Sequence, residues 1–345
     1  MLDVQWIQRL HAYGLLQPSF RPPDAIVALR AYHRQRQMQI RYAASHTQHM
    51  QKALEQMNVK LTEVVADITG LTGRKIITAI LDGERDPRVL ARLRDPKCKN
   101  DEATIAAALE GTWRHQHLFA LRQAFALYQF HHQQIDQCDA MIQAELDQLP
   151  NRCGDKTRAG KPRRCGRKAN DLSFDATGPL FRALGVDLTE IDGIDVGTAL
   201  VILAEIGVDV SRFPTEKHFA SWLGVCPRQH ESNKTIKKRG PRKGKNRVAI
   251  ALRMAAQAVG RTQSALGQFY RRIKSRIGGK GAVTATAHKL ACLVYRMLKH
   301  GREYVRQTLD EYEQKVRRQL ERSLQRKAKA LGFQLVPLTA PAATT

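Results

Sequence analysis

The sequence lacks any long uninterrupted apolar stretch. No apolar run approaches the roughly 18 residues that a membrane-spanning helix needs, which excludes an integral membrane protein. The N-terminus has no basic segment followed by an apolar segment and a small-residue cleavage site, so it does not resemble a secretory signal peptide. We therefore expect a soluble, cytoplasmic protein without a membrane partner.

Cysteine is scarce and its positions are scattered. The six residues stand singly along the chain, at Cys98, Cys138, Cys153, Cys165, Cys226 and Cys292. A disulfide-stabilised secreted domain would be short and dense in cysteine. The spacing predicts free thiols in a reducing compartment.

Acidic residues are also few relative to basic ones. The 345 residues include 57 Lys or Arg against 32 Asp or Glu, a formal net charge of +25. An excess of this size predicts a large polyanion, and hence nucleic acid, as the partner. The length and a hydrophobic content of 43% predict two or three domains with packed cores.

Two long helices are predicted in the first half of the chain. Residues 26 to about 70 contain few helix breakers, and their apolar residues recur at alternating steps of three and four, with Thr47 in the one polar position. A second segment with this spacing begins near Trp113, where His132 and Asp139 interrupt it. The apolar positions are Ile40, Ala43, Met50, Leu54, Met57, Leu61, Val64 and Ile68, then Leu118, Leu121, Phe125, Tyr128, Ile135, Ile142, Leu146 and Leu149.

This spacing is typical of a coiled-coil seam. We therefore expect a long antiparallel coiled-coil arm over residues 26–149, in which His132 and Asp139 set register or partner choice. The sequence leaves open whether the arm pairs within the chain or with a second subunit.

A basic linker follows the arm. Residues 150–170 contain eight Lys or Arg and a single Asp, interspersed with Gly and Pro and without an apolar period. A run of this kind either is simply solvated or contacts phosphate groups, and its charge density favours phosphate contact through residues such as Arg163 and Arg164.

Residues 188–207 predict a helix-hairpin-helix. A short helix, a tight turn from Gly193 to Gly197 and an apolar second helix follow one another. The glycines allow close approach, and the N–H groups at the start of the second helix can bind a phosphate oxygen. The alternative is a hairpin that only packs, which Asp195 favours because its carboxylate repels phosphate.

Ser232 lies in the most basic part of the chain. A helix is expected to end at Gly224, a loop to carry Ser232, and a new helix to begin near Asn246. Between Cys226 and Lys280 the only acid is Glu231, against sixteen basic residues: 228, 234, 237, 238, 239, 242, 243, 245, 247, 253, 261, 271, 272, 274, 276 and 280. These cations would hold a phosphodiester beside the serine. His230 is the only local candidate for a general base, so an ordinary loop serine remains the alternative.

The candidate nucleic-acid contacts near this serine are basic side chains. They are Lys234, Lys237, Lys238, Arg239, Arg242, Lys243, Lys245, Arg247 and Arg253.

Four segments of the second half carry a family resemblance: "LTEIDGIDVGTALVILAEIG", "FASWLGVCP", "NRVAIALRMAAQAVGRTQSALGQFYRRI" and "AVTATAHKLACLVYRMLKHG". With "DVQWIQRLHAYGLLQPSFRPPDAI" near the start, they resemble the insertion-sequence one-ten family of transposases, especially its eleven-eleven subgroup. The resemblance implies a split site, in which an RNase H-like domain holds Mg²⁺ on four acids and a helical domain supplies a serine nucleophile. It also implies DNA and a structured guide RNA as partners.

Within this resemblance, Asp3 corresponds to the last of the four acids, a metal ligand, and Ser232 to the nucleophile. The other three acids would lie upstream, so the resemblance implies a truncated chain that does not bind Mg²⁺ or cleave DNA alone. Asn233 and Lys234 depart from the family, which usually has glycines after this serine.

The predicted fold is mainly α. Its parts are an RNase H-like remnant at 1–25, the arm at 26–149, the linker at 150–170, a transposase domain with the helix-hairpin-helix and serine loop at 171–300, and a basic helix with a disordered tail at 301–345. Three functions remain open: a transposase that works as a dimer or tetramer, a fragment that binds the element's RNA or DNA without catalysis, and a general nucleic-acid scaffold.

Overall fold

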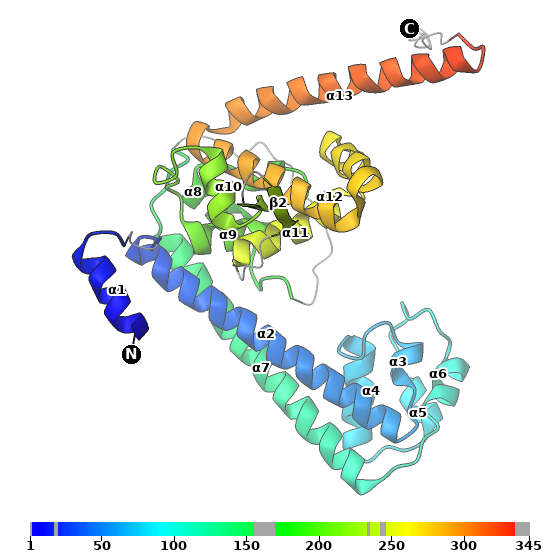
Figure 1. Cartoon of the computed structure of the whole chain (residues 1–345). Coiled ribbons are helices and arrows are strands. Elements are labelled where there is room, and N and C mark those ends of the chain that lie inside the picture. The colour runs from blue at the N-terminus through cyan, green and yellow to red at the C-terminus, as the bar shows by residue number, and fades with distance from the viewer. Residues whose placement is uncertain (1, 17–19, 155–169, 233–234, 242–245, 335–345) are drawn as a thin grey trace. The chain divides into compact units, whose positions relative to one another are not determined.

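The computed structural model describes the chain except residues 1, 17–19, 155–169, 233–234, 242–245 and 335–345, and over 227–245 only backbone is described. The fold is mainly helical, as predicted (Figure 1). It divides into two compact units. The arm unit comprises residues 28–145 and 166–174, and the main unit comprises residues 1–27, 146–165 and 175–345.

The arm unit is built on two long helices, α2 (Asp24–Gln56) and α7 (His115–Gln148). They lie side by side in Figure 1. Arg36 pairs with Asp139, whereas His46, further along α2, stacks on His131, which comes earlier in α7. The two helices therefore run antiparallel within one chain.

The apolar positions predicted for the seam are largely buried. Those with less than a tenth of their surface exposed are Ala43, Met50, Leu54, Met57, Leu61 and Ile68 from the first segment and Leu121, Phe125, Tyr128, Ile135, Ile142 and Leu146 from the second. Burial that follows the three- and four-residue steps explains why the pattern was visible in the sequence. The supercoiling of a coiled coil stays a prediction.

The sequence predicts a first helix that extends to about residue 70, but α2 ends at Gln56. Asn58 has a positive φ of 57°, its N–H bonds to Glu55 O, and Val59 N–H bonds to Leu54 O. This pattern is a Schellman ending, and asparagine tolerates the left-handed conformation that it needs. Leu61 then begins a new helix.

Four short helices gather at the far end of α2 and α7 (Figure 1). They are α3 (Leu61–Val64), α4 (Leu71–Leu81), α5 (Pro87–Ala91) and α6 (Glu102–Ala108). Asp86 and Asp101 cap the starts of α5 and α6 through their carboxylates. Ile76, Ile80 and Leu90 join the ends of α2 and α7 in one hydrophobic core, so this end of the arm is a packed helical cluster.

The main unit surrounds α9 (Val196–Ile206), whose second half is almost entirely buried. This helix packs against α8 (Thr177–Leu184), the 3₁₀ turn η1 (Leu188–Glu190) and α11 (Arg247–Val259). The other elements are α1 (Leu2–Ala12), α10 (Glu216–Leu223), β1 (Pro227–Ser232), β2 (Thr235–Pro241), α12 (Ala265–His300) and α13 (Arg302–Ala330). The basic helix predicted after residue 301 is thus present, while residues 335–345 of the expected tail lie outside the described residues.

Two parts of α12 fold back on each other at Gly278, which has a non-helical φ of 78°. The Lys289 ammonium lies 4.9 Å from the centre of the Phe269 ring. Twenty residues of continuous helix would separate these positions by about 30 Å. The contact therefore requires the chain to reverse at the glycine, and α12 is a helical hairpin.

Candidate nucleic-acid interface

The segment expected to be a loop around Ser232 is a two-stranded antiparallel hairpin, β1 and β2. Gly224 ends α10 with a left-handed φ of 75°, and Arg253 Nη2 donates to the Gly224 carbonyl oxygen at 3.3 Å. At the other end, the Asn246 side chain caps α11 by accepting from Ala249 N–H at 3.2 Å. The described residues on both sides of the hairpin are therefore held by helices.

Helix α10, which leads into the hairpin, is tied to α12. The Arg296 guanidinium makes a two-pronged ion pair with the Glu216 carboxylate. Tyr295 donates its hydroxyl to the Phe213 carbonyl oxygen at 2.7 Å, and Phe219 is fully buried beside both rings. These contacts fix the position from which β1 starts.

Ser232 is the last residue of β1 and pairs with Thr235 of β2. At about 3.3 Å per residue, its backbone is roughly 17 Å along the strand from Pro227. The register shifts by one residue between His230 and Glu231, so Lys237 is an extra residue in β2. The structure thus places the candidate nucleophile at the far end of a bulged hairpin.

The predicted basic contacts fall into three groups. Lys237, Lys238 and Arg239 lie in β2, where only the backbone is described. Arg247 and Arg253 lie in α11, and Arg247 Nε is 3.8 Å from Glu205 Oε1. Arg253 contacts the Gly224 carbonyl, so both arginines also hold the fold. Outside the described residues are Lys234, Arg242, Lys243, Lys245, Arg163 and Arg164, together with Asn233.

The two glycines of the predicted helix-hairpin-helix differ in their surroundings. A Cβ on Gly193, whose φ is +86°, would meet Val259 Cγ2 at 2.2 Å and Ala255 O at 2.8 Å. Gly193 therefore allows the turn to approach α11. Gly197 is exposed, and a Cβ there would meet only Asp195 Oδ1, at 3.7 Å.

The start of α9 is capped by a side chain of this same turn. Asp195 Oδ1 accepts from Thr198 N–H at 2.8 Å, so the carboxylate occupies part of the position where a phosphate would lie. The short helix predicted before the turn is the three-residue 3₁₀ helix η1.

Lys289 is a half-buried lysine that the sequence pattern does not single out. Burial lowers its pKa to about 8, and the nearby charges of Arg272 and Arg296 act in the same direction. Burial likewise raises the pKa of Cys292 to about 11, with Glu216 contributing. Nothing local in the sequence marks these residues, because their environment arises only when α12 folds back on itself.

Asp3 lies exposed in the first turn of α1. Among the described residues, no group of three or more His, Cys, Asp or Glu is placed to hold a metal ion. Asp3 as placed therefore does not form a complete divalent-cation site with other described residues.

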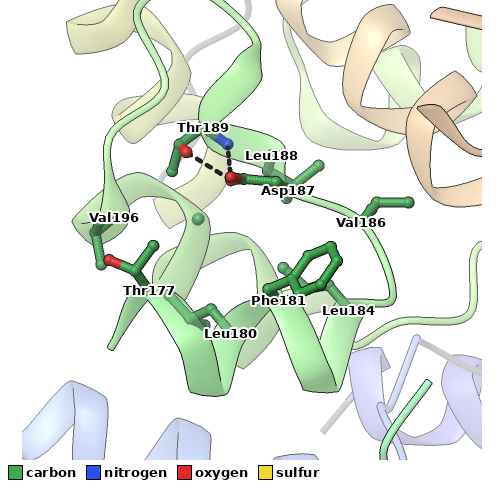
Figure 2. A pocket seen from close by; sticks show the side chains of 10 residues that line it. Thr177, Leu180, Phe181, Leu184, Val186, Asp187, Leu188, Thr189 and Val196 are labelled. Carbon is green, nitrogen blue, oxygen red and sulfur yellow. Dashed lines mark hydrogen bonds between the residues drawn. The ribbon is translucent and has the colours of Figure 1, made fainter. Parts of the chain in front are cut away.

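The pocket in Figure 2 lies among α8, η1 and α9, with Leu180 and Phe181 on its wall. Asp187 Oδ1 accepts from Thr189 N–H at 3.0 Å and from its hydroxyl at 2.5 Å. The volume of about 10 Å³ is that of about one water molecule, so this pocket does not fit a substrate. In the part of the chain that is described, no helix is long and apolar enough to span a membrane.

Comparison with known proteins connects this unit with transposition. Residues 187–271 match the model of the Transposase IS116/IS110/IS902 family. Over 121 residues, 34% of the chain, the sequence is 31% identical to the "Insertion element IS110 uncharacterized 43.6 kDa protein" of Streptomyces coelicolor, and the match covers 29% of that protein. The family match extends from η1 into α12 and includes the Ser232 hairpin. Residues 187–271 are therefore similar to a transposase domain of the IS116/IS110/IS902 family.

Proposed function

We propose that the chain acts in the transposition of an insertion sequence and that DNA is its substrate. The observation that carries this proposal is the family match over 187–271, which includes the Ser232 hairpin. The charge of the same segment supports it, because residues 227–245 carry eight Lys or Arg and one Glu. A phosphodiester bound there would be surrounded by cations.

In this proposal Ser232 is the nucleophile. Its hydroxyl oxygen attacks the phosphorus of a DNA phosphodiester, forming an Oγ–P bond while the bond from phosphorus to one deoxyribose oxygen breaks. The serine proton passes to a base, and the departing oxygen takes up a proton to become a hydroxyl. The new phosphodiester is available for rejoining, since one P–O bond has replaced another.

The expected Mg²⁺ site is not assembled from the described residues. Asp3 is exposed, and Mg²⁺ requires several oxygen ligands in octahedral geometry. The resemblance to the family supports the proposal that Asp3 is one ligand of an acidic site whose other ligands are not among the described residues.

The test is a search for a covalent protein–DNA adduct. Labelled element-end DNA is offered to the chain with Mg²⁺, the cognate RNA and a separate polypeptide that carries the family's acidic domain. We expect an adduct that survives denaturation and disappears in Ser232→Ala. The matched control is Ser275→Ala, an exposed serine in basic α12, which should leave the adduct intact.

The chain without the added polypeptide should give no adduct. An adduct that persists in Ser232→Ala would refute the proposal that Ser232 is the nucleophile. If no adduct forms under any condition but DNA and RNA are still bound, the alternative holds, and the chain is a non-catalytic fragment that binds the element's nucleic acid.

We further propose that a structured guide RNA binds through the same phosphate contacts. Affinity for both nucleic acids should fall steeply with salt, because each phosphate neutralised by a cation releases counterions. Replacing Lys237, Lys238 and Arg239 together by Gln should weaken binding to all sequences alike. Affinity that stays flat from low to moderate salt would contradict this proposal.

Transposition joins two DNA partners, and we propose that the subunits pair through the arm. Leu54 and Leu61 are fully buried within the arm unit, so a charge at either would unfold it and would not test pairing. Phe119, Phe130 and Met141 are 63%, 51% and 41% exposed and, eleven residues apart, share one face of α7. Phe130→Glu should therefore make the chain monomeric by light scattering, whereas the control Gln129→Glu should leave it paired. A wild-type chain that is itself monomeric would refute pairing through the arm.

A further inference from the structure

A groove of about 480 Å³ runs between α2 and α7 in the arm unit. We call it the histidine groove. On the α2 side it is lined by His46, His49, Lys52, Ala53 and Gln56, and on the α7 side by Ala120, Gln123, Ala124 and Leu127. None of these nine residues is acidic, so the groove offers cations and amide donors over a floor of small apolar side chains.

Three histidines gather at this groove. The ring of His46 stacks on that of His131 with a centroid distance of 5.2 Å and an interplanar angle of 14°. The ring of His49 lies edge-on to His46 at 5.6 Å. His131 is held by a hydrogen bond of 2.7 Å between its Nδ1 and Gln39 Oε1, and it also contacts Tyr42. The cluster is therefore positioned from both helices.

His46 is the unusual member of this cluster. Its Nδ1 is buried and has no hydrogen-bond partner among the described residues. Burial lowers the pKa of His46, and His131 and His49 lower it further. The ring is therefore neutral at pH 7, and protonation becomes favourable when a negative charge arrives.

None of the other described groups around His46 would stabilise its protonated form. The titratable groups acting on it are His49 on α2 and His131 on α7, both of which oppose a positive charge. Lys52 adds another cation to the groove, and the α7 residues that line it carry no charge. Within the described residues, the charge that would complement a protonated His46 must come from a ligand.

We propose that the histidine groove binds a phosphate group and takes up a proton as it does so. Lys52, Gln56 and Gln123 supply N–H donors to the phosphate oxygens, and a protonated His46 supplies a further charged donor. This proposal is independent of the Ser232 chemistry, because it concerns the arm unit alone. The same phosphate chemistry could belong to a nucleic-acid strand or to a small phosphate compound.

Proton uptake on binding gives the proposal a measurable consequence. Between the pKa of His46 in the free chain and its higher pKa in the complex, affinity should fall by up to about tenfold per pH unit, because one proton is bound with the ligand. By the same linkage, the ligand must raise the pKa of His46. Phosphate contacts through lysine and arginine alone would not do so.

The experiment is NMR of the histidine ring protons in the full-length chain, titrated with and without inorganic pyrophosphate and, separately, a short oligouridylate. We expect pyrophosphate to raise the pKa of His46 by about one unit, equivalent to about tenfold in proton affinity. A rise with both probes indicates that the groove accepts a nucleic-acid backbone, and a rise with pyrophosphate alone indicates a small phosphate ligand. No rise with either probe overturns the proposal.

Substitutions in the histidine groove test whether the rise in the pKa of His46 comes from a ligand bound there. Ala120→Leu fills it from an exposed helical position, and Gln123→Glu places a carboxylate in it with little change in size. Both should abolish the rise, so either one suffices if the other does not fold. Lys52→Gln should reduce it, and His115→Gln, an exposed histidine outside the groove, should leave it unchanged. A full rise in Ala120→Leu or Gln123→Glu would show that the ligand binds elsewhere.

Discussion

Arg36 and Asp139 form a buried ion pair between α2 and α7, with only 5% and 1% of their side chains exposed. Arg36 Nη2 also donates to the carbonyl oxygens of Asn170 at 3.2 Å and Asp171 at 3.0 Å, while Ser173 N–H donates to Asp139 Oδ2 at 2.8 Å. Asp139, which interrupts the apolar seam of α7, thus lies where residues 170–173 contact both helices. This geometry accounts for the register role expected of Asp139.

The first prediction follows from the cost of leaving one of these charges alone. Asp139→Ala should destabilise the arm unit by about 3–5 kcal/mol, because Arg36 would stay buried without its partner. The double variant Arg36→Met with Asp139→Leu should recover most of the loss, since it buries apolar groups. Urea unfolding of the full chain measures both. A cost below about 1 kcal/mol for Asp139→Ala would mean that water reaches Arg36.

The second prediction separates the two hairpin glycines. Gly193→Ala should cost about 1–3 kcal/mol or more, because its Cβ would overlap Val259 and Ala255 and its φ is positive. Gly197→Ala is the matched control and should be neutral or slightly stabilising, since it lies exposed in the first turn of α9. Thermal melts of both variants test this. Equal effects would show that the turn does not pack on α11 as described.

The third prediction concerns the cap of α9. Asp195→Ala should lose about 0.5–2 kcal/mol, because Thr198 N–H loses its acceptor. Asp195→Asn keeps an acceptor and removes the negative charge, so its stability should stay close to that of the wild type. If the turn contacts phosphate, Asp195→Asn should also bind DNA more tightly at low salt. Unchanged binding by this variant would argue that the hairpin only packs.

The elements predicted best are those whose burial repeats along the sequence. The α2 and α7 seam was visible because each helix buries one stripe, and α9 because it is apolar on nearly every side. The end of α2 was missed because a single asparagine, Asn58, stops a pattern that otherwise continues through Leu61. Periodicity reports which face is buried and does not report whether the backbone is continuous.

The sequence predicts which residue types form the candidate site, but it predicts only part of the site's geometry. The charge around Ser232 and the helices on either side were foreseen, but β1 and β2 lack the alternation of a buried strand and were expected to be a loop. Gly193 was expected to approach a ligand, and the close neighbour that the structure gives it is α11, about 60 residues later. Contacts between distant segments have no local signal, although the Gly278–Gly279 pair marks the point where α12 reverses.

The last prediction concerns Lys289, the half-buried lysine of α12. Because the pKa of Lys289 falls from 10.5 to about 8 on folding, the folded chain binds fewer protons between these values than the unfolded chain does. Stability should therefore rise with pH across this window, and below pH 8 the charged form is a cost to folding. Lys289→Met removes that cost and keeps an apolar contact with Phe269. Its melting temperature should exceed that of the wild type near pH 7, and the difference should shrink as pH rises towards 10.5. Lys274→Met, on the exposed side of α12, is the control for loss of a charge. A difference that grows with pH would show that Lys289 is stabilised as a cation.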